Sequence, residues 1–192
     1  MIYRIFDDMS QCSEREITRL LPLVSEQRRE QALRYTHTFG QYCCLKSYEM
    51  LVELLEEWSG GEIQEKPVFL YNEYGAPYLQ DGPYFSISHC KTGIAVAVSD
   101  TPIGVDIESL RALNDGLVCK TMNDVEQNQI FDSVHPEMEF IRLWTRKEAY
   151  VKMQGTGIIS DMHDILTNLP LIEKKEIVCP DKKYICTIVK KA

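Results

Sequence analysis

Hydrophobic and polar positions alternate at the start of the chain and then follow helical spacing. Residues 1–9 alternate over IYRIF, which favours a first strand. Ser25 stands where an N-cap would precede a helix that begins with SEQRREQALRY. Apolar side chains then recur at helical spacing over about 41–58 and are followed by Gly60. We therefore expect a longer helix that ends at this glycine.

Shorter segments with strand character follow this helix. Gly, Pro and Asn residues separate them, as in a chain that turns between strands. KPVFLY precedes the turn NEYGAP, YFSISHC and GIAVAVS are separated by residues 91–93, and TPIGVDIES comes next. The pair around residues 91–93 predicts a hairpin.

The second half of the chain repeats this rhythm. A helix is expected at about 123–134 and a stronger one from Pro136 to Gln154, where Gly155 ends it. The strands EKKEIVC and KYICTIV follow, with a turn between them. We therefore predict an α+β fold of two similar lobes, residues 1–103 and 104–192. Because no low-complexity linker separates the halves, we expect them to pack closely.

The composition is that of a globular protein with an excess of acidic residues. Of the 192 residues, 44% are hydrophobic and 26% are charged, and 29 acidic against 21 basic side chains give a net charge of −8. This charge disfavours nucleic acid as a partner, since phosphate contacts need a basic surface. No apolar run approaches the ~20 residues of a membrane span, and the N-terminus lacks a signal-peptide pattern. We expect a cytoplasmic protein with no membrane or nucleic-acid partner and with reduced cysteines.

The first candidate for chemistry is the strand GVDIE at 104–108. Residues two apart in a strand point to the same face, so Asp106 and Glu108 would present two carboxylates side by side. Two hard oxygen ligands at this spacing suit Mg²⁺. The alternative is a half-exposed strand with a solvated acidic face.

The second candidate is WTRKEAYVK at 144–152. Trp144, Glu148 and Lys152 are four residues apart and so share one helical face. Glu148 could complete a metal site or accept a proton, and Lys152 could contact a phosphate. The alternative is a surface Glu–Lys pair with Trp144 in the core.

Two further candidates could bind anions. Ser88 and His89 end the strand SISH, where a hydroxyl and an imidazole can hold a phosphate oxygen. Arg28 belongs to a basic cluster with Arg29 and Arg34 on the predicted helix after Ser25. A backbone-bonded histidine and a solvated helix face are the alternatives.

The order SISH, GVDIE and WTRKEAYVK resembles the surfactin-type 4′-phosphopantetheinyl transferases. Their second and third motifs are a G-x-D-x-E strand and a W-x-x-K-E-A-x-x-K helix, and both motifs are complete here. YGAP at 74–77 is similar to the YGKP turn of the family, and PIG before VDIE also matches. The resemblance spans roughly residues 25–158.

The resemblance implies a fold and an activity. It implies two lobes related by a pseudo-twofold axis, with coenzyme A bound between them. Such a protein transfers the 4′-phosphopantetheine arm of coenzyme A to a serine of an acyl- or peptidyl-carrier protein and releases 3′,5′-ADP. The chain is expected to act as a monomer, since two lobes can form the site within one molecule.

The resemblance also implies roles for individual residues. Asp106, Glu108 and Glu148 would hold Mg²⁺, and Glu148 would also be the base for the carrier serine. Lys152 would contact the phosphates and ease departure of the nucleotide. The N-terminal lobe would bind the phosphates of coenzyme A through Arg28, Ser88 and His89.

The chain departs from the family at three positions. Ala76 replaces the lysine of YGKP, Gln31 replaces a basic residue, and Cys43 lies where an arginine is often found. The 3′-phosphate of the cofactor would lose cationic partners. A relative that binds coenzyme A or a carrier protein without transfer is therefore the alternative function, and a Mg²⁺-dependent phosphohydrolase is a third.

Overall fold

The two halves of the computed structural model, which describes residues 1–157, 162–167 and 169–192, have a similar order of elements. Each half begins with a strand, continues through helices to a long one, and ends in a hairpin. The first half contains β1 (Ile2–Phe6), a short 3-10 helix (Met9–Gln11), α1 (Glu14–Leu20), α2 (Glu26–Leu33), α3 (Thr38–Ser59), β2 (Leu70–Tyr71), β3 (Pro77–Tyr78), β4 (Tyr84–Cys90) and β5 (Gly93–Ser99). The second contains β6 (Ile103–Ser109), α4 (Asp115–Thr121), α5 (Asp124–Phe131), α6 (Pro136–Gln154), β7 (Ile172–Cys179) and β8 (Tyr184–Lys191).

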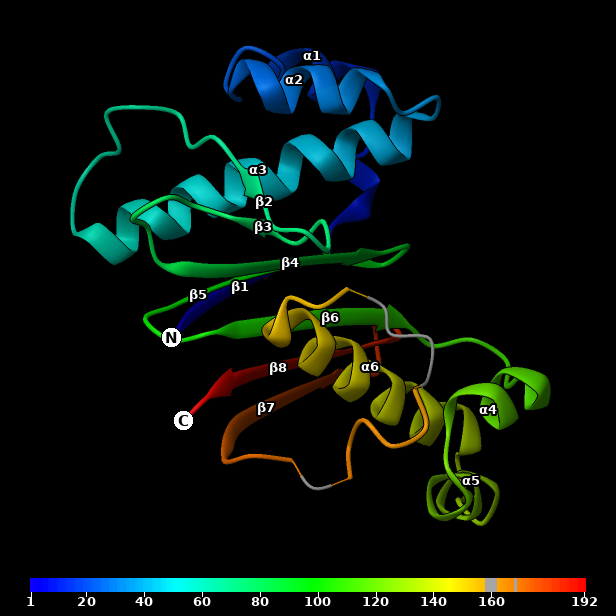
Figure 1. Ribbon diagram of the computed structural model, residues 1–192. Helices are drawn as coiled ribbons and strands as arrows, with labels where there is room; N and C mark the ends of the chain where they lie inside the picture. The colour runs from blue at the N-terminus through cyan, green and yellow to red at the C-terminus, as the bar shows by residue number, and fades with distance from the viewer. Residues whose placement is uncertain (158–161, 168) are drawn as a thin grey trace.

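The main sheets of the two halves have the same topology. One is three-stranded in the order β1-β5-β4 and the other three-stranded in the order β6-β8-β7, with antiparallel pairing throughout. In each sheet the last strand of the half is central and the first strand is at an edge. Figure 1 shows α3 between the α1–α2 pair and the first sheet, and α6 across the second sheet. The prediction of an α+β fold is confirmed.

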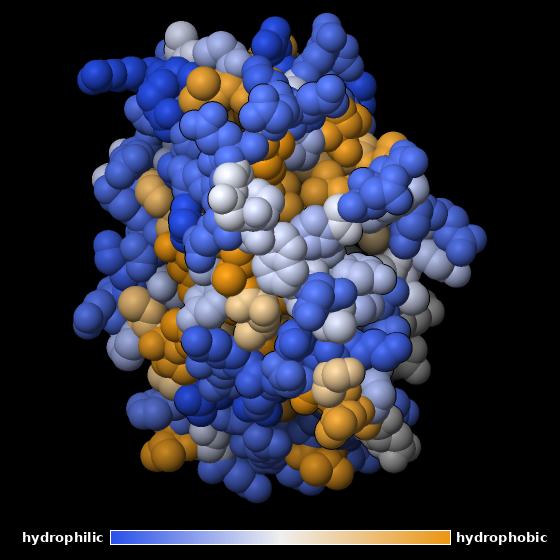
Figure 2. Space-filling model, turned by 90° about the vertical axis from the view of Figure 1, so that its left-hand side faces the viewer, coloured by the Kyte–Doolittle hydropathy of each residue, from blue (hydrophilic) through white to orange (hydrophobic). Residues whose placement is uncertain are grey.

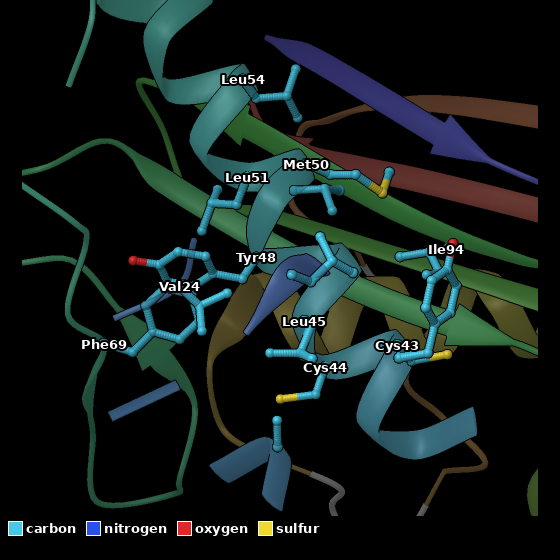
Figure 3. Packing of buried hydrophobic residues seen from close by; sticks show 14 of the residues in the cluster. Val24, Cys43, Cys44, Leu45, Tyr48, Met50, Leu51, Leu54, Phe69 and Ile94 are labelled. Atoms are coloured by element: carbon cyan, nitrogen blue, oxygen red, sulfur yellow. The ribbon is translucent and has the colours of Figure 1, made fainter. Parts of the chain in front are cut away.

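The largest apolar cluster packs α3 against the first sheet. Its buried members include Tyr48, Leu51 and Leu54 of α3, together with Phe69 and Ile94. Figure 3 shows these side chains gathered around α3. The helix has a broad apolar face, as the spacing of its hydrophobic residues predicted, and it ends at Gly60, whose left-handed φ of 73° favours glycine.

A second apolar cluster joins the two halves. Ala95 and Ala97 of β5 pack with Val105 of β6 and with Cys186 and Ile188 of β8, all of them buried. The strand β5 thus contributes one face to the α3 core and its other face to this shared core. Each half also has a cluster of its own, around α3 in the first half and around Phe140 and Ile141 of α6 in the second, so the shared cluster lies between two separate ones.

Most of the elements expected from the sequence are present. Ser25 accepts a hydrogen bond from the Arg28 amide as the N-cap of α2, and α6 has the predicted bounds and ends at Gly155. The segment KPVFLY forms a strand only at Leu70–Tyr71, where it pairs with the unexpected β3. The helices α1 and α4 were not predicted, because each is only seven residues long.

The surface carries apolar side chains in separate groups. Figure 2 shows such patches, among hydrophilic residues, on the face that lies at the left of Figure 1. Within the described ranges, no helix combines the length and the apolar character needed to cross a membrane.

Candidate functional site

The site is built where α6 lies directly on β6. A Cβ atom at Gly104 would lie 1.8 Å from the Ala149 carbonyl oxygen and 2.6 Å from the Met153 amide nitrogen. These are backbone atoms of the helix, so they cannot move aside as a side chain would. Glycine at this position therefore permits the close approach that brings the carboxylates of β6 next to Glu148 and Lys152.

Asp106 is at the centre of the site. It is 4% exposed, and its Oδ1 accepts hydrogen bonds from Ser88 Oγ at 2.8 Å and from Lys152 Nζ at 2.7 Å. Lys152 Nζ also donates to Ser88 Oγ at 2.9 Å, which closes a triangle of three side chains. The other carboxylate oxygen, Asp106 Oδ2, is buried and has no hydrogen-bond partner among the described residues. A buried carboxylate oxygen without a partner is costly unless a cation or a donor reaches it.

Glu108 and Glu148 are partly buried beside Asp106. Burial raises the pKa of both carboxyl groups, and the negative charge of Asp106 is the next largest cause in each case. Asp106 is therefore close enough to both carboxylates to repel them. As they lie, however, no three His, Cys, Asp or Glu side chains of the described residues are arranged closely enough to hold a metal ion.

The serine side chains of the segment SISH in β4 form hydrogen bonds with β6. Ser86 Oγ accepts a hydrogen bond from the Val105 amide at 3.0 Å, and Ser88 donates to Asp106. The two serines thus connect the sheets of the two halves. His89, next along β4, is exposed and packs edge-on against Phe39 with ring centroids 6.2 Å apart.

The surroundings of the His89 imidazole disfavour its protonated form. Partial desolvation lowers its pKa, and the positive charges of Lys152 and Arg28 lower it further. The ring can still donate a hydrogen bond to an anion, and an anion that binds there would raise the pKa again.

A cavity of about 290 Å³ is lined by Glu148 and Lys152. The turn between β2 and β3, the strand β4 and the C-terminal end of α6 form its walls, with lining residues that include Tyr74, Ala76, Ser86, Glu148, Lys152 and Gly155. Asn72 holds the turn against α6, because its Nδ2 donates to the Gly155 carbonyl at 2.8 Å. The sequence predicted a turn at NEYGAP, but it gave no signal that Asn72 contacts the distant helix.

A larger hollow of about 530 Å³ lies elsewhere, between the end of α3 and the β2–β3 hairpin. Trp58, Ile63, Val68 and Leu79 are among its lining residues, and none of the carboxylates described above lines it. We therefore place the candidate site at the smaller cavity, where the charged side chains converge.

Arg28 is placed differently from the other predicted residues. It is 9% exposed, and its guanidinium donates to the Cys44 carbonyl, Gln31 Oε1 and Ser47 Oγ, each at 2.9 Å. It also lies over the ring of Phe69, 5.2 Å from the centroid. Its charge is felt at His89, but a direct contact with a bound phosphate would require some of these hydrogen bonds to change.

Lys147 is a buried residue of the motif for which the sequence suggested no role. Its side chain is fully buried, and Nζ donates to Glu126 Oε2 at 2.6 Å, to the Thr121 carbonyl at 2.8 Å and to the Met162 carbonyl at 2.7 Å. It therefore ties α6 to α4, to α5 and to the segment after α6. Nothing in the sequence indicated this structural role of Lys147, which directly precedes Glu148.

Comparison with known proteins supports the family resemblance. The model of the 4′-phosphopantetheinyl transferase superfamily matches residues 102–189. A relative from Bacillus subtilis, the 4′-phosphopantetheinyl transferase ffp, is 26% identical over 97% of this chain and 84% of its own length. The 4′-phosphopantetheinyl transferase Sfp of Bacillus subtilis strain 168 is 24% identical with the same coverage. The 4′-phosphopantetheinyl transferase AcpT of Escherichia coli O157:H7 is 33% identical over 52% of this chain and 58% of its own length.

The matched region contains β6 and α6, the two elements that supply the carboxylates and Lys152, and the longer alignments extend the likeness to the N-terminal half. The C-terminal half of the chain is therefore similar to the 4′-phosphopantetheinyl transferase superfamily, and nearly the whole chain is similar to its Bacillus members.

Proposed function

We propose that this protein transfers the 4′-phosphopantetheine arm of coenzyme A to a serine of an acyl- or peptidyl-carrier protein. The bond that forms joins the serine oxygen to the phosphorus of the arm, and the bond that breaks releases 3′,5′-ADP. The arrangement of Asp106 carries this proposal. It is a buried carboxylate that accepts hydrogen bonds from Lys152 and Ser88, its other oxygen has no partner among the described residues, and Lys152 lines the cavity.

The chemistry of the donor set suits a magnesium ion, but the three carboxylates would have to move closer together to hold one. Asp106 Oδ2 is buried without a partner among the described residues, and burial and then the charge of Asp106 disfavour the ionised forms of Glu108 and Glu148. A divalent cation would relieve both, and Mg²⁺ prefers carboxylate oxygens. We propose that these three residues hold Mg²⁺, which when bound neutralises charge on the pyrophosphate.

Lys152 and Glu148 perform the proton and charge chemistry in this proposal. Both line the cavity. The Lys152 ammonium would donate hydrogen bonds to the departing phosphate as it gains negative charge. Glu148 would accept the proton of the serine hydroxyl, because it lines the same cavity as Lys152.

The N-terminal half completes the cofactor site. We propose that residues 1–103 supply contacts to the phosphates of coenzyme A and that residues 104–192 supply the metal ligands. Ser88 and His89 border the carboxylates and present a hydroxyl and a neutral imidazole. Arg28 contributes its positive charge from below the surface, where its hydrogen bonds fix it.

The halves are arranged so that one molecule contains both sides of the site. Their equal strand orders support a pseudo-twofold relation between two lobes, and we propose that the protein acts as a monomer. We also propose a cytoplasmic location, because all seven cysteines are free thiols, as is usual in a reducing compartment.

Mass spectrometry of a carrier protein tests this function. An apo-carrier protein is incubated with the enzyme, coenzyme A and Mg²⁺, and the carrier is then weighed. A gain of one phosphopantetheine group supports transfer. Release of nucleotide without a gain in carrier mass would instead indicate a hydrolase, and neither product would indicate a relative that binds without transfer.

A further inference from the structure

Lys152 contacts the carboxylate that the proposed metal would need. Its ammonium donates to Asp106 Oδ1 at 2.7 Å and to Ser88 Oγ at 2.9 Å, and its side chain is 30% exposed against 5% for Asp106. The lysine therefore reaches the buried carboxylate from the cavity side. Its single positive charge partly compensates Asp106, while Asp106 Oδ2 keeps no partner among the described residues.

We propose that Lys152 is a positioning residue that competes with the metal ion for Asp106, so that the metal and coenzyme A bind cooperatively. This inference rests on the proposed function, because it concerns the same carboxylates and the same phosphate ligand. Lys152 occupies Asp106 in the free chain, and it is released toward the cavity when a divalent cation takes its place.

Electrostatic repulsion favours this exchange. An ammonium and a divalent cation that share one carboxylate repel each other strongly at a separation of a few ångströms, and burial weakens the screening by water. Lys152 has a flexible side chain and lines the cavity together with Ser86 and Glu148, so it has somewhere to go. The buried carboxylate has no such freedom, because it belongs to the central part of β6.

The exchange couples two binding events. When the metal displaces Lys152, the ammonium becomes free to donate to a phosphate in the cavity. When a phosphate attracts Lys152 first, Asp106 becomes free to accept the metal. By linkage, each ligand must then increase the affinity for the other by the same factor. The lysine thereby keeps the free protein from holding the metal tightly without its substrate.

Binding of Mn²⁺, a spectroscopic substitute for Mg²⁺, tests this inference without any turnover. The Kd of Mn²⁺ is measured by electron paramagnetic resonance for the full chain and for Lys152→Gln, with and without coenzyme A and in the absence of carrier protein. We expect Lys152→Gln to bind Mn²⁺ about tenfold more tightly without coenzyme A, the change that 1.4 kcal/mol produces. We also expect coenzyme A to improve Mn²⁺ binding more in the natural protein than in this variant.

Two further variants separate competition from a general change in charge. Lys182→Gln removes one positive charge from the exposed turn between β7 and β8, and it should change the Kd of Mn²⁺ much less than Lys152→Gln does. Asp106→Asn in the Lys152→Gln background should abolish the gain, because the contested carboxylate is gone. Unchanged or weaker Mn²⁺ binding by Lys152→Gln, or an equal effect of both lysine variants, would overturn the inference.

The inference and the proposed function can fail separately. If the natural protein modifies a carrier but Lys152→Gln does not bind Mn²⁺ more tightly, the competition is wrong and the transferase activity stands. If Lys152→Gln binds Mn²⁺ more tightly but no carrier gains mass, the competition stands and the activity is wrong.

Discussion

Ionisation of the Glu148 carboxyl group destabilises the folded protein. Burial and the charge of Asp106 raise its pKa above the usual value of 4.5, and the same two causes act on Glu108. In the pH range between the usual and the raised pKa, the folded protein binds more protons than the unfolded chain. Stability therefore falls as the pH rises through this range, and the ionised groups destabilise the free protein at neutral pH.

Replacing Glu148 with glutamine should accordingly stabilise the protein while removing its activity. Glu148→Gln keeps the shape of the side chain but removes the repulsion by Asp106 and the proposed base. We expect a higher Tm than that of the natural protein at pH 7, a difference that disappears near pH 4, and transfer reduced to near background. Each 1 kcal/mol corresponds to about 2–4 °C in a chain of this size. Calorimetry across pH and carrier-mass assays measure the two effects, and a lower Tm at pH 7 would contradict the electrostatic argument.

Ala76 stands where the family that the chain resembles has a lysine, and this difference should affect the binding of coenzyme A. It lines the cavity and lies near the end of α6, since a Cβ at Gly155 would be 3.9 Å from the Ala76 Cβ. The resemblance assigns this position to a lysine that holds the 3′-phosphate, far from the reacting phosphorus. The natural protein should therefore distinguish coenzyme A only weakly from dephospho-coenzyme A.

We expect Ala76→Lys to lower KM for coenzyme A and to leave kcat nearly unchanged, because a remote contact acts mainly on ground-state binding. An exposed ion pair contributes about 0.2–1 kcal/mol and a charge-assisted bond about 1.5–3 kcal/mol, so the gain should be a few-fold to about a hundredfold. Steady-state kinetics with both cofactors measure it. Strong natural rejection of dephospho-coenzyme A, together with no effect of Ala76→Lys, would show that another cation holds the 3′-phosphate.

At the scale of elements, the contact between β6 and α6 decides the geometry of the site. The strand GVDIE supplies Asp106 and Glu108, and the helix supplies Glu148 and Lys152. Their separation depends on Gly104, which has no side chain to hold the helix away. A change at this glycine should therefore damage stability and activity together.

Gly104→Ala tests this dependence. The added methyl group would meet backbone atoms of α6 at 1.8 Å and 2.6 Å, so the helix must shift or the strand must bend. Overpacking of this kind typically costs about 1–3 kcal/mol. Gly116→Ala in α4 is the control, because its nearest contact is 3.4 Å away and alanine favours a helix. Thermal unfolding should show a loss for Gly104→Ala and no loss for Gly116→Ala, and equal stabilities would refute the close contact.

The elements that the sequence predicted best are those whose patterns are long or sharply bounded. The helices α3 and α6 have repeated apolar spacing and end in left-handed glycines, and the β4–β5 hairpin has alternating segments around a short turn. Two elements of seven residues, α1 and α4, gave too few repeats to show a period. The motifs predicted which charged side chains share one face of a strand or of a helix, because that depends only on their spacing along the chain.

Contacts between distant segments could not be inferred in the same way. The bond from Asn72 to Gly155, the internal hydrogen bonds of Arg28 and the network around Lys147 depend on how the elements pack. Arg28 and a solvent-facing arginine have the same sequence signature, and only burial among Cys44, Ser47 and Phe69 distinguishes them. The sequence therefore indicated the candidate site residues but not the long-range contacts that hold them in place.

At the scale of the whole molecule, the shared core predicts that the two halves unfold as one unit. Ala95 and Ala97 of β5 pack with Ile188 of β8, so neither half can lose its structure without exposing apolar surface of the other. The chain has two tryptophans, Trp58 at the end of α3 and Trp144 on α6, which report on one half each. In Trp144→Phe and Trp58→Phe variants, the remaining tryptophan should therefore show a single unfolding transition that coincides with circular dichroism of the same variant.

The replacement Ile188→Ala tests the shared core directly. Ile188 is 1% exposed in the cluster between the sheets, and truncation of a buried isoleucine to alanine costs about 2–5 kcal/mol. Because the cluster belongs to both halves, we expect Ile188→Ala to lower the midpoint reported by Trp58 as much as the midpoint reported by Trp144. Val125→Ala is the matched control, since Val125 is 75% exposed on α5 and its truncation should change neither midpoint. A shift of the Trp144 midpoint alone would mean that the halves unfold independently and that the site between them opens without global unfolding.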